Sequence, residues 1–401
     1  MVIMAKLKDL LNRGVLEIID RKSLLDKLNS GRKLIVKLGI DPTNKDLHIG
    51  HYLVLQKLRD FQDAGHEAVL VIGDFTARIG DPSGKDTKRM ALNRSQIKEN
   101  MRYYTSLAGK IIDLQKARIE YNSSWFDKLG MDGIINLASK ATFAQVMERK
   151  EFRRRLKQDD LSLLEFLYPL LQAYDSVVLR ADVEIGGQDQ KLNLLMGRQI
   201  QKRYNQPEQD IVLTPLLVGL DTRAKMSKTA GNYVAMTDPP NEMFGKIMSI
   251  PDILMKDYFV YCTRVPLKDI GLLFSRLSSG QISQMNLKKR LASELVSIYY
   301  GKNKAGEAAK EFERVFQKGE RTSTVQTSVQ PRSILPISYA TLATISGATS
   351  SVSEAVRLAD NNGLKVGGRI VANPRELIKK IHGPETIIDV GKRKSVKIIW
   401  K

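Results

Sequence analysis

Hydrophobic and polar positions in the first half of the chain predict strands separated by amphipathic helices. The β-branched run LIVKLG at 34–39 ends in glycine and is typical of a buried strand, and EAVLVIG at 67–73 is a second such run. Between them, residues 52–65 carry apolar side chains at helical spacing and end in Gly65. Because strand, helix and strand follow in this order, we predict an α/β fold with a parallel, doubly wound sheet. Further strand candidates lie at 117–121, 182–187 and 211–218.

Stretches with helical periodicity precede, interrupt and follow these strands. Residues 6–30 carry leucines at near-helical spacing and predict one helix. The stretch 122–181 is too long for a plain crossover and predicts a helical insertion, which can serve substrate closure or dimerisation. Residues 236–317 predict an α-helical domain with one apolar stripe, made of Leu287, Leu291, Leu295 and Ile298.

A change of composition separates the last part of the chain. Residues 318–334 are rich in Ser, Thr, Gln and charge and lack periodicity, so we predict a linker. Residues 335–401 carry 11 Lys and Arg against 5 Asp and Glu, which favours a small basic α+β module that contacts RNA. We therefore expect a catalytic domain at 1–235, then the helical domain, the linker and this module.

The net charge of +20 indicates that the protein binds a polyanion such as nucleic acid. A generally basic proteome is the alternative explanation. Cys262 is the sole cysteine, which excludes an intrachain disulfide and a cysteine-based zinc site and favours a reducing cytoplasm. No apolar run reaches the roughly 18–20 residues that cross a bilayer, and the first residues do not resemble a signal peptide. We expect a cytoplasmic protein that does not bind a membrane.

The residues after the first predicted strand suit phosphate binding. Asp41 and Thr43 are followed by His48, Gly50 and His51 at the start of a helix. A helix N-terminus offers unpaired N–H groups and a positive dipole end, and imidazoles three residues apart share one helical face. Glycine lets a flat nucleotide ring approach the backbone. A capped helix with surface histidines, or half of a metal site, would give the same string, but nothing nearby completes a metal site.

Lys225 and Lys228 lie in a loop after the last predicted strand. Two such lysines can hold the β- and γ-phosphates of a nucleotide as charge develops on leaving pyrophosphate, although a loop of this kind is more often a solvated surface turn. With the histidine cluster about 175 residues earlier, the pattern resembles the class I aminoacyl-tRNA synthetases. This resemblance implies a Rossmann-like sheet and ATP with Mg2+, without a dedicated protein metal site. It also implies that the carboxylate of the amino acid attacks the α-phosphorus, so that no protein nucleophile is needed.

Three further motifs resemble the tyrosyl-tRNA synthetases within that class. They are GDPSGK at 80–85, GGQDQ at 186–190, and Tyr168-x-x-x-Gln172-x-x-Asp175 on one helical face. The resemblance implies that Asp81, Tyr168 and Gln172 hold the ammonium group of tyrosine and that Asp175 accepts its phenol hydroxyl. Because an unpaired buried carboxylate is costly, such a site can discriminate against Phe by about 10⁴–10⁵-fold. A core helix face and a tight βα turn are the plain structural alternatives.

Besides these tyrosine-binding residues, the resemblance implies two further groups of site residues. Those with catalytic roles are His48, His51, Lys225, Lys228, Thr43 and Lys85. Those that bind ATP or the adenylate are Gly39, Asp41, Gly50, Gly187, Asp189, Gln190 and Lys228, and Gln190 also contacts tyrosine. Lys37 is a departure, because some members of the family carry there a tyrosine that touches the substrate hydroxyl. Recognition of the hydroxyl then depends more on Asp175.

The C-terminal module contains SVSEAVRL at 351–358, GLKVGGR at 363–369 and a strand-like run at 386–399. With these segments it resembles a small RNA-binding domain found in a ribosomal protein and at the end of many bacterial tyrosyl-tRNA synthetases. Its two predicted phosphate-contacting surfaces are Arg357, Lys365 and Arg369, and Lys392, Arg393 and Lys394. A solvated charged face is the alternative for each. The resemblance implies L-tyrosine, ATP and tRNA(Tyr) as partners, and a homodimer with much of its contact formed by residues 122–165.

Other functions stay open at this stage. A synthetase-derived protein that only binds RNA would not need His48, Lys225 or Asp175 intact. A related enzyme for tryptophan would not need Asp175 or the RNA-binding module. The basic run at 149–155 either guides the acceptor end of tRNA or forms a solvated helical face.

Overall fold

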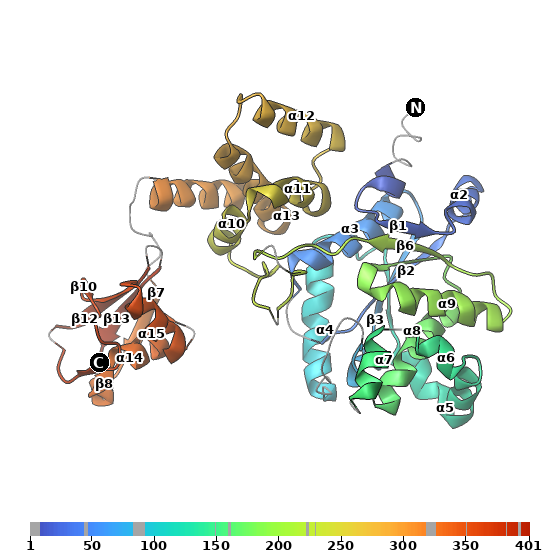
Figure 1. Ribbon diagram of the computed structural model, residues 1–401, viewed down its shortest axis with the longest axis horizontal. Helices are drawn as coiled ribbons and strands as arrows, with labels where there is room; N and C mark the ends of the chain where they lie inside the picture. The colour runs from blue at the N-terminus through green and yellow to red at the C-terminus, as the bar shows by residue number, and fades with distance from the viewer. Residues whose placement is uncertain are drawn as a thin grey trace. The chain divides into compact units, whose positions relative to one another are not determined.

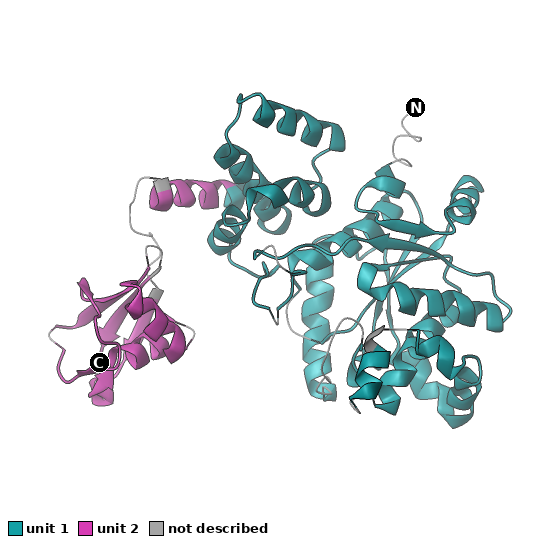
Figure 2. Cartoon of the chain, in the orientation of Figure 1, with its two compact units in different colours: residues 1–305 teal, residues 306–401 magenta. Residues whose placement is uncertain are grey.

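The chain folds into two compact units, Met1–Ala305 and Gly306–Lys401 (Figure 1; Figure 2). This computed structural model describes residues 9–43, 47–82, 93–148, 150–158, 162–221, 224–228, 230–317, 326–349, 351–381, 383–391 and 394–401. Among the described residues, none of the helices combines the length and the apolar character needed to cross a membrane.

The first unit is built on a twisted sheet with the strand order β1-β6-β5-β2-β3-β4 (Figure 1). Its strands are β1 (Glu17–Ile19), β2 (Ile35–Ile40), β3 (Glu67–Ile72), β4 (Arg118–Tyr121), β5 (Val183–Gly187) and β6 (Asp210–Thr214). All neighbours from β6 to β4 pair in parallel, and β1 is antiparallel to β6. The parallel, doubly wound α/β sheet predicted from the sequence is therefore confirmed. The last predicted strand is shorter than expected, because Pro215 has no N–H to continue the ladder after Thr214.

The single helix predicted at 6–30 is wrong. The described part of this segment contains a helical turn at 9–12, then β1, then α2 (Arg21–Asn29). Gly14 and Asp20 adopt positive φ angles of 62° and 63°, which no α-helix allows. Asp20 then caps α2 by accepting a hydrogen bond from the backbone N–H of Ser23. The leucine spacing over 6–30 fits a helix, but Glu17–Ile19 pair with β6 at the edge of the sheet instead.

Helices cover both faces of this sheet. Lys37 in β2 points toward α8 (Leu163–Leu179), with which it forms hydrogen bonds. Since side chains alternate along a strand, Val36 and Leu38 point to the opposite face, and α3 (Ile49–Asp63) contacts β2 there. The other helices around the sheet and in the helical insertion are α4 (Arg94–Ala108), α5 (Ser123–Ala138), α6 (Phe143–Val146), α7 (Lys150–Lys157) and α9 (Lys191–Arg203).

After the sheet the chain is helical, as the sequence predicts. The elements of this region are α10 (Pro240–Met248), α11 (Met255–Cys262), α12 (Leu267–Ser278) and α13 (Gln284–Phe312), with one-turn helical segments at Asp252–Leu254 and Glu313–Gln317. Elsewhere among the described residues, one-turn segments lie at Thr76–Arg78, Gln188–Gln190 and Arg332–Ile334. Leu287, Leu291 and Leu295 of the predicted stripe are fully buried. Gly301 interrupts α13 with a φ of 82°, so the helix is kinked at this position.

The second unit contains a mixed sheet with the order β10-β9-β12-β13-β7 and a short pair, β11-β8. Its elements are β7 (Gln326–Gln330), β8 (Ile337–Ser338), α14 (Tyr339–Ile345), α15 (Val352–Asp360), β9 (Leu364–Val366), β10 (Arg369–Ile370), β11 (Leu377–Ile378), β12 (Glu385–Val390) and β13 (Lys394–Trp400). This is the small α+β fold expected here. The predicted linker at 318–334 is too long, because β7 pairs in parallel with β13. The polar sequence of this segment does not indicate a strand, because β7 lies at the edge of the sheet and is held by backbone hydrogen bonds to β13 rather than by apolar burial.

The basic run at 149–155 contains a buried ion pair. Arg153 and Arg154 are exposed in α7, whereas the Arg155 side chain is buried and its guanidinium lies 2.9 Å from the Glu165 carboxylate in α8. Glu165 also accepts hydrogen bonds from the N–H and hydroxyl groups of Ser162. Arg155 is therefore not available to guide tRNA, and it joins two helices of the insertion.

Replacing Arg155 with Met should lower the free energy of unfolding by about 3–5 kcal/mol, because Glu165 keeps a buried charge without its partner. Urea unfolding measures the change. Lys157→Met, at an exposed position of the same helix, is the matched control and should change stability by no more than about 0.5 kcal/mol. The double variant Arg155→Met/Glu165→Leu should recover most of the loss. A single variant as stable as the control would contradict this account.

Candidate active site

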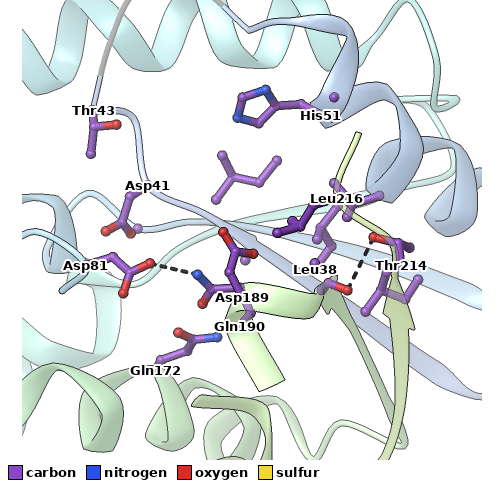
Figure 3. Close-up of a pocket in the computed structure, with 18 of the residues that line it drawn as sticks. Leu38, Asp41, Thr43, His51, Asp81, Gln172, Asp189, Gln190, Thr214 and Leu216 are labelled. Carbon is purple, nitrogen blue, oxygen red and sulfur yellow. Dashed lines mark hydrogen bonds between the residues drawn. The ribbon is translucent and has the colours of Figure 1, made fainter. Parts of the chain in front are cut away.

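A cavity of about 600 Å³ opens at the carboxyl ends of the parallel strands in the first unit. Its lining contains every residue predicted for substrate binding and catalysis except Lys85, which lies outside the described residues. These are Gly39, Asp41, Thr43, His48, Gly50, His51, Asp81, Tyr168, Gln172, Asp175, Gly187, Asp189, Gln190, Lys225 and Lys228. Figure 3 shows His51 and Gln172 on opposite sides of this cavity, with Asp41, Asp81 and Asp189 between them.

The two histidines form the N-terminal cap of α3. The Nδ1 atom of His48 accepts a hydrogen bond from Gly50 N–H at 3.2 Å, and His48 N–H points to Nδ1 of His51 at 3.3 Å. A Cβ atom on residue 50 would lie 2.8 Å from His48 Nδ1, so this packing alone requires glycine. Burial, followed by the neighbouring His51 and Lys228, lowers the pKa of His48 to about 2. Burial and Lys228 lower the pKa of His51 to about 4, so both rings are neutral at physiological pH.

The lysine loop is organised by a residue that the sequence analysis did not assign to the site. Asn232 is buried; its side-chain oxygen accepts from the Ser227 N–H at 2.8 Å, and its amide donates to Asp221 at 2.9 Å. Lys225 reaches the carboxylate of Asp189 at 2.7 Å. The loop therefore holds its first lysine beside Asp189, one of the residues predicted to bind ATP or the adenylate. A side-chain amide that bridges the two arms of a loop leaves no signal in hydrophobic periodicity.

Asp175 occupies a buried part of the cavity. It accepts a hydrogen bond from the indole N–H of Trp125 at 3.0 Å, and Asn122 Nδ2 lies 3.5 Å away. Burial raises its pKa to about 7, against the opposing effects of Lys37 and of these two donors. Asn122 directly follows β4, so the rule that strand ends meet at one edge could have identified it.

A hydrogen-bond chain links Asp175 to the residues that follow β2. Asn122 donates to the Thr76 hydroxyl at 3.0 Å, and Thr76 donates to Asp41 at 2.8 Å. The second Asp41 oxygen accepts from the hydroxyl of Tyr168 at 2.9 Å. Thr76 and Asn122 thus hold the side chains of two predicted binding residues in fixed orientations. Neither was predicted.

Asp81 and Gln190, from two different strand ends, are in direct contact. The Gln190 amide donates to Asp81 at 2.7 Å, as the dashed line in Figure 3 marks. Among the residues that the structure describes, His, Cys, Asp and Glu side chains nowhere gather in a group of three or more that could hold a metal ion. The cavity thus presents carboxylates suited to an ammonium group and lysines with neutral imidazoles suited to phosphates.

Comparison with known proteins assigns this arrangement to a class. The family described as tRNA synthetases class I (W and Y) matches residues 29–317. Two solved tyrosyl-tRNA synthetases share the fold: a truncated mitochondrial one from Aspergillus nidulans (TM-score 0.66, 22% identity, 78% of this chain and 94% of that one) and one from Archaeoglobus fulgidus (TM-score 0.61, 24% identity, 77% and 100%). The chain belongs to this class I family.

Close relatives narrow the assignment within the family. The tyrosine–tRNA ligase of Carboxydothermus hydrogenoformans is 41% identical over 98% of this chain and 97% of its own length. The corresponding enzyme of Haemophilus influenzae is 43% identical over 97% of this chain and 95% of its own length. Identity of this degree over nearly the whole chain puts it with the tyrosine–tRNA ligases.

Asn232→Ala should slow tyrosine-dependent ATP–pyrophosphate exchange about tenfold to a hundredfold, because a loop without the hydrogen bonds of the Asn232 side chain positions Lys225 and Lys228 less well in the transition state. The Kd for tyrosine should stay unchanged, since among the described residues the Asn232 side chain forms its hydrogen bonds with Asp221, Lys225 and Ser227 of the loop. Exchange kinetics and tyrosine-induced tryptophan fluorescence measure the two quantities. Asn303→Ala, at an exposed position, is the control. Weaker tyrosine binding with an unchanged exchange rate would overturn this role.

Proposed function

We propose that the chain activates L-tyrosine with ATP to form tyrosyl-adenylate and pyrophosphate, and then transfers tyrosine to the 3′ end of tRNA(Tyr). The observation that carries the proposal is the pairing, in one cavity, of a buried carboxylate on α8 with lysines and neutral imidazoles on α3 and the lysine loop. The first feature suits a phenol hydroxyl and the second a polyphosphate. The high identity to tyrosine–tRNA ligases supports the same reaction.

We assign the recognition of tyrosine to the residues around α8. Asp175 already accepts the Trp125 indole N–H, and its position in the cavity lets it accept a phenol O–H as a further donor. Phenylalanine would leave this buried carboxylate without that donor, which costs binding energy. Asp81, Tyr168 and Gln172 are assigned to the ammonium group, with Gln190 beside them.

We assign the chemistry of activation to the residues of α3 and the lysine loop. The tyrosine carboxylate attacks the α-phosphorus of ATP, and the bond from that phosphorus to the pyrophosphate oxygen breaks. Because His48 Nδ1 is an acceptor and the ring is neutral, its proton sits on Nε2, which can donate to phosphate. Lys225 and Lys228 neutralise the leaving pyrophosphate. Thr43, Gly39, Gly50, Gly187 and Asp189 complete the nucleotide site, and the role of Lys85 stays a prediction.

Mg2+ is proposed to arrive with ATP rather than in a preformed protein site. The cavity offers Asp41, Asp81 and Asp189, but each already pairs with a side chain of the protein. A Mg2+ ion bound mainly by phosphate oxygens and water fits such a site. When bound it would neutralise the charge on the phosphates.

The second unit is proposed to bind the tRNA backbone. Arg357 and Arg369 are exposed and Lys365 is half-buried. Lys365 and Arg369 lie on the paired strands β9 and β10, and α15, which carries Arg357, contacts β9. Lys392 and Arg393 lie outside the described residues, and only the backbone of Lys394 is described. The division into domains at 235 and 317 belongs to this proposal.

A homodimer and a cytoplasmic location complete the proposal. Helical insertion residues 122–165 expose several large apolar side chains, which are Met131, Ile135, Phe143, Leu156, Leu163 and Leu164. Exposed apolar side chains gathered in one segment are typical of an interface. The cytoplasm supplies the ATP and tRNA that the reaction consumes.

The purified protein should catalyse ATP–pyrophosphate exchange with tyrosine, and not with phenylalanine or tryptophan. In Asp175→Asn the ratio of kcat/KM for tyrosine over phenylalanine should fall by at least about 100-fold, because the anionic acceptor is lost. Asp182→Asn, outside the cavity, controls for a general effect of charge removal. Exchange with tryptophan would move the assignment to the other branch of the family. Exchange with no amino acid would leave only RNA binding.

Replacing Arg357, Lys365 and Arg369 together with Ala should raise the KM for tRNA and reduce the slope of log KM against log salt by about 2, because each lost phosphate contact removes part of the counterion release. Tyrosine-dependent pyrophosphate exchange should stay at its wild-type rate. Lys379→Ala/Lys380→Ala, a pair of exposed lysines in the same unit, is the control. If both variants lower tRNA affinity equally, the assigned surface has no special role.

A further inference from the structure

Lys37 is a charged residue in the middle of the central strand β2, and its side chain is completely buried. Moving an ammonium group out of water is costly unless the protein provides both a counter-charge and hydrogen bonds. A lysine at this position therefore needs an explanation. Lys57, on α3, is the other fully buried lysine among the described residues, and it lies outside the lining of the cavity.

The surroundings of Lys37 satisfy all three of its N–H donors. Glu184 stands opposite it on β5, and its carboxylate lies 2.9 Å from Nζ. Nζ also donates to the hydroxyl of Ser176 at 2.7 Å and to the backbone carbonyl of Gln172 at 3.1 Å. The ammonium therefore joins α8 to two strands of the sheet.

The part of α8 that Lys37 holds is the part that carries the substrate-facing side chains. Gln172 and Ser176 mark the two ends of one helical turn, and Asp175 lies within it. Gln172 and Asp175 both line the cavity. The Glu184 carboxylate receives further hydrogen bonds from Ser176 and Gln209, so the contact is a closed network rather than a single ion pair.

Charge balance gives Lys37 a second effect. Two charged groups face Asp175, which are Lys37 on β2 and Glu184 on β5. The uncharged donors Trp125 and Asn122, at the start of α5, also face it. Lys37 lowers the pKa of Asp175, whereas burial and Glu184 raise it. Without the ammonium, two carboxylates would share a buried region with no cation, and one of them would take up a proton.

We propose that Lys37 is a specificity-determining positioning residue, whose buried ammonium fixes the α8 turn bearing Gln172 and Asp175 and keeps Asp175 anionic toward the phenol hydroxyl of the substrate. The proposal rests on the proposed role of Asp175. It assigns to an internal ion pair, rather than to a side chain that touches the substrate, part of the choice between tyrosine and phenylalanine.

The pH dependence of tyrosine binding provides the test. An acid with a pKa of about 7 is anionic above that pH and neutral below it, so the KM for tyrosine should rise as the pH falls through about 7. In Lys37→Met the midpoint of this rise should move upward by at least about one pH unit, which corresponds to about a fivefold higher KM for tyrosine at pH 7 and about a tenfold higher KM at pH 6 and below. The KM for phenylalanine should rise much less than the KM for tyrosine, because phenylalanine depends on the turn that carries Gln172 but not on the anionic acceptor. The kcat for tyrosine should change by less than about threefold.

Two further variants separate this role from a general loss of stability. Lys57→Met removes the other buried lysine and should leave the midpoint for tyrosine where it is in the wild type. The double variant Lys37→Met/Glu184→Gln removes both charges of the pair, so its midpoint should lie between those of the wild type and Lys37→Met. If Lys37→Met does not fold, the double variant decides by the same measurement.

Three results would overturn the proposal. They are a wild-type midpoint in the Lys37 variants, equal losses for tyrosine and phenylalanine, and the same shift in Lys57→Met. Failure of the proposed function is a different outcome, because the wild-type protein itself would then show no tyrosine-dependent exchange.

Discussion

The parallel pairing of β2 with β5 is the constraint on which the rest of the first unit depends. From β2 the chain continues to β3 and β4 on one side, and it returns to β5 and β6 on the other. Helices that follow neighbouring strands in opposite directions leave a crevice at the carboxyl ends. The histidine cap follows β2 and the Gly187–Gln190 turn follows β5, so this one pairing brings the two sides of the site together.

The same pairing places charge in the interior. The register of β2 and β5 places Lys37 directly opposite Glu184, and their ion pair supports α8, the helix that completes the cavity. The neutral state of the imidazoles and the raised pKa of Asp175 have the same origin, since burial disfavours charge unless a partner is close. The site therefore has one end with carboxylates and another with lysines and neutral imidazoles because each buried group has a different set of partners, and not because its composition is unusual.

Hydrophobic periodicity was sufficient for the parallel sheet, the insertion and the later helices, because these elements bury apolar side chains in a regular pattern. It failed at β1 and β7, where short segments join sheet edges through backbone hydrogen bonds and carry no distinctive pattern. The basic run at 149–155 was ambiguous for a related reason. Sequence records the charge of Arg155 but not the partner, Glu165, that a neighbouring helix brings to it.

Sequence by itself determined the residue types of the site and their order along the chain. Motif spacing and resemblance were enough to name the histidines, lysines and aspartates that line the cavity. Only the tertiary structure decided which groups support them: Asn232 in the loop, Thr76 and Asn122 in the hydrogen-bond chain, and Lys37 beneath α8. The physical reason is that a supporting residue acts through contacts between distant segments. Such contacts depend on strand register and helix packing, which no local pattern encodes.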